Sequence, residues 1–289
     1  MSRTLSARPR SLELAAEAAE CVQRATVARG GRAPVLAAVA ATEDVAALIY
    51  MEQLLKQAAT AGFTVKKISL PATASEGEIT TALERLSADA DVAGIILQSP
   101  LPEGVDRTRV VTGIAVEKDI DGITAASAAR LSAGDLDGTL LPATAAAVME
   151  LLRAHQIEIH GRRAVVVGRS DVVGRPVAQL LALAGAHVEV VHSKTPDMGA
   201  VTRTAQILVV AAGVCALVRG EHVSPGCVVV DVGIHVQGDQ IVGDVDEASV
   251  RDAVGETGAL SPVPGGVGPM TNAILVLQAA QSALRLAGA

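Results

Sequence analysis

Short apolar runs rich in β-branched residues recur along the chain, and most are separated by alanine- and leucine-rich stretches with a helical period. The apolar runs predict strands over Val35–Val39, Thr64–Ile68, Ala93–Leu97, Ala164–Val167, His187–Val191, Ile207–Val210 and Val228–Val232. The intervening stretches predict helices over Ala46–Ala61, Glu76–Ala88 and Pro176–Ala184. Nearly all-apolar strands that alternate with helices are typical of a parallel sheet covered on both faces. The sequence therefore predicts an α/β fold.

The alternation of strands and helices falls into two blocks. The first block ends near residue 140, and a helical stretch over Thr144–Ala154 leads into a second block that starts at Gly161. A last helical segment over Asn272–Leu286 follows a loop rich in proline and glycine. A chain of 289 residues is long enough for two modest domains, and we expect one for each block.

Composition narrows the class of protein further. Apolar residues make up 50% of the chain and charged residues 19%, which favours a substantial aliphatic core. A formal net charge of −7 argues against a chain-wide nucleic-acid surface. The apolar runs are too short for a transmembrane helix, and residues 1–14 lack the apolar core of a signal peptide, so we expect a cytoplasmic protein. Three cysteines without CxxC spacing predict no disulfide framework, and six histidines without paired spacing predict no metal site.

The second block opens with an apolar strand, a glycine-containing turn and a helix. In this turn Gly168 lets the backbone approach a ligand, and Gly174 allows close contact near the helix start. Amide groups at such a helix start can hold a phosphate. The spacing departs from GxGxxG because Ser170 occupies the middle position, and a plain strand-to-helix connection remains an alternative.

The strand that follows indicates which dinucleotide the turn would bind. Folds that prefer NAD place an acidic residue at the end of this strand, about 20 residues after the turn, to hold the ribose hydroxyls. Here His187–Val191 continues into His192–Thr195 without an acid. Arg169 and Ser193 suit a ribose 2′-phosphate, which a carboxylate would repel. Lys194 is a weaker candidate, because it also fits an exposed loop. We therefore expect NADP as the cofactor.

Six unusual strings occur in one order across the chain: Ile95–Pro102, Glu117–Gly122, Val167–Gly174, His192–Thr195, Val230–Ile234 and Ser261–Thr271. Together they make the sequence resemble the methylenetetrahydrofolate dehydrogenase/methenyltetrahydrofolate cyclohydrolase family over nearly its whole length. The resemblance implies two α/β domains with a cleft between them, a catalytic folate domain over 1–145 with 273–289 packing back on it, and a Rossmann-like NADP domain over 146–272. Members are usually homodimers. They oxidise 5,10-methylenetetrahydrofolate with NADP and then hydrolyse the methenyl product.

The resemblance also implies functional positions. The positions that match the family's cofactor site are Gly168, Arg169, Ser170, Gly174, Ser193 and Ile234. The positions that match its catalytic and folate site are Tyr50, Gln98 and Asp121, together with the loop residues Pro262, Gly265 and Gly266. A carboxylate at Asp121 suits the donor pair of a pterin ring. A plain turn at Asp121, a polar strand end at Gln98 and a rigid linker at the loop remain alternatives.

The first long helix departs from the family pattern. The family reads Ser-x-x-Tyr-x-x-x-Lys there, whereas this chain retains Tyr50 but has Ala47 for the serine and Leu54 for the lysine. Lys56 lies off the face of Tyr50, because residues six apart on a helix are separated by about 120°. It suits a solvated helix face. We expect Leu54 to face the same cleft as Tyr50.

This departure leads to three hypotheses about activity. The first is an NADP-dependent methylenetetrahydrofolate dehydrogenase with weak or absent cyclohydrolase activity, because attack by water needs proton handling that the lysine would provide. The second is a repurposed member that acts on another folate-bound one-carbon unit in a specialised pathway. The third is a catalytically silent folate- or NADP-binding protein.

Overall fold

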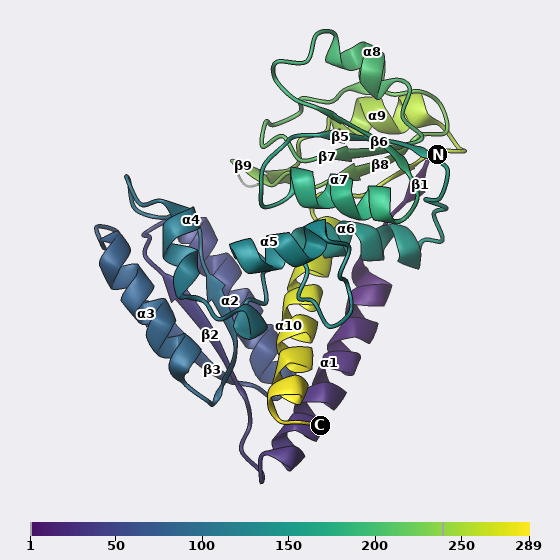
Figure 1. Cartoon of the computed structure of the whole chain (residues 1–289). Coiled ribbons are helices and arrows are strands. Elements are labelled where there is room, and N and C mark those ends of the chain that lie inside the picture. Colours follow the sequence, from purple (N-terminus) through teal and green to yellow (C-terminus); the bar gives the residue numbers. More distant parts are fainter. Residues whose placement is uncertain (1, 239) are drawn as a thin grey trace. The chain divides into compact units, whose positions relative to one another are not determined.

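The structure, a computed structural model, describes residues 2–238 and 240–289 (Figure 1). The chain divides into two compact units, which we name by their sheets. The six-stranded unit consists of Met1–Ser11 and Thr144–Thr271, and the three-stranded unit of Leu12–Ala143 and Asn272–Ala289. Both sheets are parallel throughout, so the predicted two-domain α/β fold is confirmed.

The six-stranded unit has the strand order β1-β11-β8-β7-β5-β6. Its sheet strands are β1 (Arg3–Thr4), β5 (Arg163–Val167), β6 (His187–Val191), β7 (Ile207–Val210), β8 (Val228–Asp231) and β11 (Ala259–Leu260). Its helices are α6 (Ala143–Ala154, of which all but the first residue belongs to this unit), α7 (Gly174–Leu183), α8 (Met198–Thr202), η3 (Gly220–His222) and α9 (Glu247–Val254). The strands β9 (His235–Gln237) and β10 (Gln240–Val242) form a separate antiparallel pair.

Helices cover both faces of this sheet because its central strands are apolar at every position. Alternate residues such as Val165 and Leu208 pack in one cluster with Val250 and Val254 of α9. The intervening residues are equally buried, and α7, which contacts β5 and β6, buries its own Val177 among others. Figure 1 shows α7 and α9 on opposite sides of these strands. The carboxyl ends of the strands are thereby left to loops.

The three-stranded unit has the strand order β3-β2-β4. Its strands are β2 (Val35–Ala40), β3 (Thr64–Ser69) and β4 (Val92–Leu97). Its helices are most of α1 (Arg8–Ala28), α2 (Val45–Thr60), α3 (Glu76–Ala88), α4 (Arg107–Val110), η1 (Val111–Gly113), η2 (Val116–Lys118), α5 (Ala125–Ser132) and most of α10 (Val267–Leu286). From α10 the Gln278 amide donates to the carbonyls of Ile120 and Leu141 and so fixes both ends of the Asp121 segment.

The predicted strands all form, with ends that differ by at most one residue, and α3 begins and ends as predicted. The last helix begins at Val267, five residues earlier than expected, because the glycine-rich loop turns directly into its first turn. No helix of the described residues is long and apolar enough to cross a membrane.

Candidate functional site

The turn after β5 is built around two glycines that allow backbone segments to touch. Gly168 has φ +120°, and a Cβ on it would lie 2.1 Å from the Ala211 carbonyl oxygen. A Cβ on Gly174 would lie 2.4 Å from the Gly168 carbonyl oxygen. Side chains at these positions would collide with backbone rather than with flexible groups. The close packing predicted for this strand, turn and helix is therefore present.

The Ser170 side chain bonds within this turn. Its hydroxyl accepts hydrogen bonds from the amides of Val173 and Gly174, each at 3.2 Å. The serine thus caps the start of α7 and occupies two of the amides that could otherwise meet a phosphate. Any phosphate at this turn would need the neighbouring amides, side chains or a shift of the Ser170 hydroxyl.

Arg169 and Ser193 follow neighbouring strands at the same edge of the sheet. Val167 of β5 pairs with Val191 of β6, and the Gly168 amide donates to the Val191 carbonyl at 2.8 Å. Because the strands are parallel, the residues just beyond this pair emerge side by side. Both Arg169 and Ser193 are exposed. The Arg169 guanidinium and the Ser193 hydroxyl therefore lie at the same edge of the sheet, and no acidic residue follows β6 over His192–Thr195.

A buried pair of aspartates, which sequence reasoning did not single out, organises the ends of β7 and β8. The Asp231 carboxylate accepts from the amides of Gly233, Asp244 and Val245, each at 3.0 Å, and burial raises its pKa to about 6 despite these bonds. The Asp244 carboxylate accepts from Ala212 and Gly213. The sequence offered only one local indication of this pair, which is that Asp231 stands near the end of the predicted strand.

The predicted loop residues lie in the six-stranded unit, just after β11. Gly265 accepts a hydrogen bond from the Ala7 amide at 2.9 Å, which ties the loop to the N-terminal segment. Pro262 is partly exposed and Gly266 is buried. Ile234 is 58% exposed, and a Cβ on Gly268 would lie 3.7 Å from its Cδ1 atom. Ile234 and this loop are therefore neighbours within one unit.

In the three-stranded unit, Tyr50 and Asp121 form one electrostatic cluster. Burial raises the pKa of Tyr50 well above its usual range, and the Asp121 carboxylate raises it further. Burial also raises the pKa of Asp121 to about 7, while Arg107 opposes the shift and Asp119 adds to it. The guanidinium of Arg107 lies 3.7 Å from the Asp121 carboxylate. Sequence reasoning missed Arg107, because nothing in its local sequence marks it.

The two aspartates of the Asp-x-Asp-Gly string have separate roles. Asp119 is fully buried, and its carboxylate accepts from the amides of Ile123 and Thr124 and from the Ser127 hydroxyl. It therefore fixes the start of α5. The Asp121 carboxylate has no side-chain hydrogen bond within the described residues, and its side chain is 21% exposed. The structure thus leaves Asp121 available to a ligand while Asp119 supports the fold.

Gln98 emerges from the end of β4 in a partly exposed position. Its backbone amide donates to the Val39 carbonyl at 2.8 Å, and its side-chain amide donates to the Ser99 carbonyl at 3.0 Å. No hydrogen bond joins it to Tyr50 or Asp121 in residues 2–238 and 240–289. Gln98 therefore lies at the carboxyl edge of the sheet without belonging to the Tyr50–Asp121 cluster in this conformation.

Two lysines, Lys56 and Lys118, are placed where neither supplies an ammonium group beside Tyr50. Leu54 is fully buried, so the expectation that it faces an open cleft beside Tyr50 is wrong, and it packs in the core instead. Lys56 is exposed, as expected of a solvated position. The buried ammonium of Lys118 donates to the carbonyls of Ser87 and Asp89, and burial lowers its pKa. Its hydrogen bonds hold it at the end of α3.

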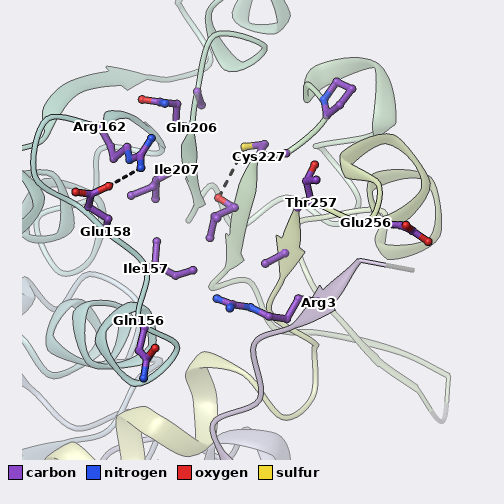
Figure 2. Close-up of a pocket in the computed structure, with 16 residues that line it drawn as sticks. Arg3, Gln156, Ile157, Glu158, Arg162, Gln206, Ile207, Cys227, Glu256 and Thr257 are labelled. Atoms are coloured by element: carbon purple, nitrogen blue, oxygen red, sulfur yellow. Dashed lines mark hydrogen bonds and ion pairs between the residues drawn. The ribbon is translucent and has the colours of Figure 1, made fainter.

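A cavity of about 580 Å³ in the six-stranded unit is a competing site (Figure 2). It lies at the amino ends of β7, β8 and β11, the sheet edge opposite Gly168. Much of its polar lining is already paired: Arg162 bonds Glu158 at 2.5 Å, and Gln206 accepts from the Arg163 amide. Burial raises the pKa of the Cys227 thiol to about 12. In parallel α/β sheets ligands bind at the carboxyl ends of strands, so this cavity is the weaker candidate.

Comparisons with known families cover almost the entire chain. Residues 5–121 match the catalytic domain of tetrahydrofolate dehydrogenase/cyclohydrolase, and residues 142–287 match the NAD(P)-binding domain of the same family. A bifunctional protein FolD from Nocardia farcinica is 46% identical over 272 residues, which cover 93% of this chain and 94% of the relative.

Solved structures show the same similarity in three dimensions. The bifunctional FolD methylenetetrahydrofolate dehydrogenase/cyclohydrolase of Campylobacter jejuni superposes with a TM-score of 0.92 at 34% identity, covering 99% of each chain. The FolD of Trypanosoma brucei, solved with NADP cofactor and an inhibitor, gives a TM-score of 0.90 at 33% identity over 98% of each chain. Both units of this chain therefore have counterparts in those enzymes.

Proposed function

Because the chain belongs to the tetrahydrofolate dehydrogenase/cyclohydrolase family, we propose that it oxidises 5,10-methylenetetrahydrofolate to 5,10-methenyltetrahydrofolate with NADP. One observation carries this proposal: the glycine turn after β5 keeps its close backbone contacts while an arginine and a serine flank it at the same sheet edge. A site of this kind suits a dinucleotide with a 2′-phosphate. A carboxylate for the pterin is available at Asp121.

The residues divide between two ligands in this proposal. The dinucleotide would be held by Gly168, Arg169, Ser170, Gly174, Ser193 and Ile234. The folate would be held by Tyr50, Gln98, Asp121, Pro262, Gly265 and Gly266. The three-stranded unit is then the folate domain and the six-stranded unit the NADP domain. Their boundaries lie close to residues 145 and 273, but the first eleven residues, expected in the folate domain, belong to the six-stranded unit because β1 pairs with β11.

Positioning accounts for most of the proposed oxidation. The chemistry that NADP supplies when bound is acceptance of a hydride. The protein contributes by holding the substrate methylene in place, and the nitrogen lone pairs of the substrate assist hydride loss. Asp121 would orient the pterin by accepting from its amino group and ring nitrogen. Tyr50 is protonated near neutral pH even at the ordinary tyrosine pKa of about 10, and burial raises its pKa further, so it acts as a hydrogen-bond donor and not as a base.

Hydrolysis of the methenyl product is the step that we propose is weak or lost. Attack by water requires a group that accepts and releases a proton near neutral pH. Leu54 is apolar, and the hydrogen bonds of Lys118 hold it among backbone carbonyls. Arg107 keeps a positive charge near Asp121, but a guanidinium does not release its proton in proteins. Asp121, whose pKa burial raises to about 7, could exchange a proton, but in this proposal its carboxylate is occupied by the pterin. The residues around Tyr50 therefore support hydride transfer better than proton transfer.

A spectrophotometric assay tests the proposal. Purified protein is mixed with 5,10-methylenetetrahydrofolate and NADP, and formation of reduced cofactor is followed together with methenyl absorbance. Matched formation of the two products supports the dehydrogenase. Binding of both ligands without turnover would support a silent binding protein instead. Turnover with a different folate-bound one-carbon unit, and none with the methylene form, would support a repurposed member.

Assembly and location are further proposals that rest on family resemblance alone. We propose a homodimer in the cytoplasm. Light scattering on the purified chain should then give about twice the 29.3 kDa of one copy. A mass of one copy at micromolar concentration would contradict the dimer.

A further inference from the structure

The Asp121 carboxylate has a cationic neighbour outside the set of residues assigned above. This neighbour is Arg107, the first residue of α4. Its guanidinium lies 3.7 Å from an Asp121 oxygen, donates to the Ser99 hydroxyl and reaches the Leu97 carbonyl at 3.5 Å. Its side chain is 25% exposed. The arginine is therefore held in place beside the proposed pterin acceptor.

Strand register explains why the three segments meet. Asp119 forms a parallel bridge with Ile95 of β4. Asp121 follows in the turn after this bridge, and Leu97 ends β4 two residues after Ile95. The Arg107 guanidinium bonds the Leu97 carbonyl and the Ser99 hydroxyl at the end of β4. The bridge and these bonds together place Arg107 beside Asp121.

Neither charged group uses up its hydrogen-bonding capacity in this arrangement. A separation of 3.7 Å is too long for a hydrogen bond between guanidinium and carboxylate. The Nε atom of Arg107 is buried without a hydrogen-bond partner among the described residues. Buried donors of this kind are normally satisfied, so an unpaired one suggests a missing acceptor. The pair presents an acceptor and a donor side by side.

The pyrimidine edge of a pterin has the complementary pattern. Its 2-amino group and N3–H donate, and the adjacent 4-oxo group accepts. We propose that Arg107 is a specificity-determining residue of the folate site, which donates to the 4-oxo group while Asp121 accepts from the neighbouring donors. This inference rests on the proposed folate function and names the ligand edge that the site recognises. The ligand class is a 2-amino-4-oxo pteridine.

The alternative is that Arg107 only braces the loop after β4 through Ser99. A brace would affect stability and all folate ligands alike, whereas a donor to the 4-oxo group would affect one ligand edge. The charged and titratable groups that face Asp121 are Arg107 on α4, Asp119 after η2 and Tyr50 on α2. Arg107 and the protonated Tyr50 can both donate, but only Arg107 among these three carries a permanent positive charge. A comparison of two ligands that differ at position 4 can therefore separate the two roles.

The test compares folic acid with its 4-amino analogue, which replaces the oxygen acceptor by a donor and also lacks the N3–H donor that faces Asp121. Calorimetry would measure both affinities for the unaltered protein and for Arg107→Leu, Arg107→Lys and Arg109→Leu. Arg109 lies on the same short helix, and its side chain is 73% exposed, so it serves as the matched control. We expect the unaltered protein to prefer the 4-oxo ligand by about tenfold or more, because a mismatched buried donor is costly.

The preference should fall by about tenfold in Arg107→Leu, where only the contact between Asp121 and N3–H still distinguishes the ligands, and it should persist in Arg107→Lys and Arg109→Leu. Equal weakening of both ligands in Arg107→Leu, with an unchanged ratio, would overturn the inference and leave the folate function standing. If Arg107→Leu does not fold, a fall in the preference in Arg107→Met, which has no donor, serves the same purpose. If the unaltered protein bound neither ligand and did not turn over methylenetetrahydrofolate, the proposed function and this inference would fail together.

Discussion

The turn after β5, the proposed cofactor site, and helix α2, which carries the proposed catalytic Tyr50, differ in how they tolerate change. The turn depends on backbone contacts that any side chain at Gly168 or Gly174 would disrupt, and both glycines are present. In α2 the family serine and lysine are Ala47 and Leu54, and the helix still packs, with Leu54 fully buried. A function that depends on backbone geometry is thus tied to the fold. A function that depends on one polar side chain can be lost without loss of the fold, because an apolar residue can pack in its place.

The sharpest test of the folate half of this comparison is Asp121→Ala. Removing a carboxylate that accepts two hydrogen bonds should weaken folate binding by at least about 100-fold, because bonds to charged groups contribute roughly 1.5–3 kcal/mol each. NADP affinity should stay unchanged, since the proposed cofactor residues belong to the other unit. Calorimetry with each ligand alone measures both, with the exposed Asp137→Ala as the control. Unchanged folate binding would mean that Asp121 belongs to a plain turn and does not bind the folate.

Leu54→Lys tests whether the position where the family has lysine is now part of the apolar core. Because Leu54 has no solvent exposure, the new ammonium would be buried without a partner, and the free energy of unfolding should fall by about 3–5 kcal/mol. Leu54→Met, which conserves volume, should cost less than about 1.5 kcal/mol. Urea unfolding monitored by circular dichroism gives both values. A lysine variant as stable as the parent would mean that the side chain finds water or an acceptor.

Arg169→Ala tests the cofactor half of the comparison. NADP binding should weaken by roughly 1.5–3 kcal/mol, because one charged hydrogen bond to the 2′-phosphate is lost. NAD binding should change little, since NAD lacks that phosphate. Fluorescence titration with the two reduced cofactors provides the measurement. Equal losses for both would refute the role assigned to Arg169.

The smallest predicted effect is a pH dependence of folate affinity. Burial raises the pKa of Asp121 to about 7, and an ionised carboxylate is needed to accept from the pterin. Protonation below this pKa therefore opposes binding, and affinity should be about tenfold weaker at pH 6 than at pH 8. Asp121→Asn should remove this dependence. An affinity that is constant across this range in the unaltered protein would contradict the role of its ionisation.

Much of the fold could be predicted from local patterns because its strands are short apolar runs with clear ends. The strand His187–Val191 and the helix Glu76–Ala88 coincide with their predictions. Helix α1 was harder to see, because three of its four buried residues are Ala18, Val22 and Ala25, which give a weak apolar stripe. The addition of β1 to the sheet beside β11 links residues more than 250 positions apart. No local pattern predicts such a pairing.

The candidate site likewise contains residues that local sequence identifies and residues that only the folded structure reveals. Motif residues such as Gly168 and Asp121 could be identified from spacing and from the family resemblance. Arg107 could not, because Arg109 lies two residues away on the same helix and differs from it only in what the fold places alongside. The Ser170 cap on α7 likewise depends on hydrogen-bond directions that the sequence does not reveal. The missing information was which side chains and backbone groups the fold brings into contact.

Hydrolysis of 5,10-methenyltetrahydrofolate by the unmodified protein tests the central claim most directly. The decay of methenyl absorbance is followed at several protein concentrations, beside a buffer control and a dehydrogenase assay on the same preparation. With Leu54 in the core where the family has lysine, we predict a decay rate close to that in buffer while dehydrogenase activity is present. Rapid decay that rises in proportion to protein concentration would show that another group handles the proton, and the separation of the two activities would be wrong.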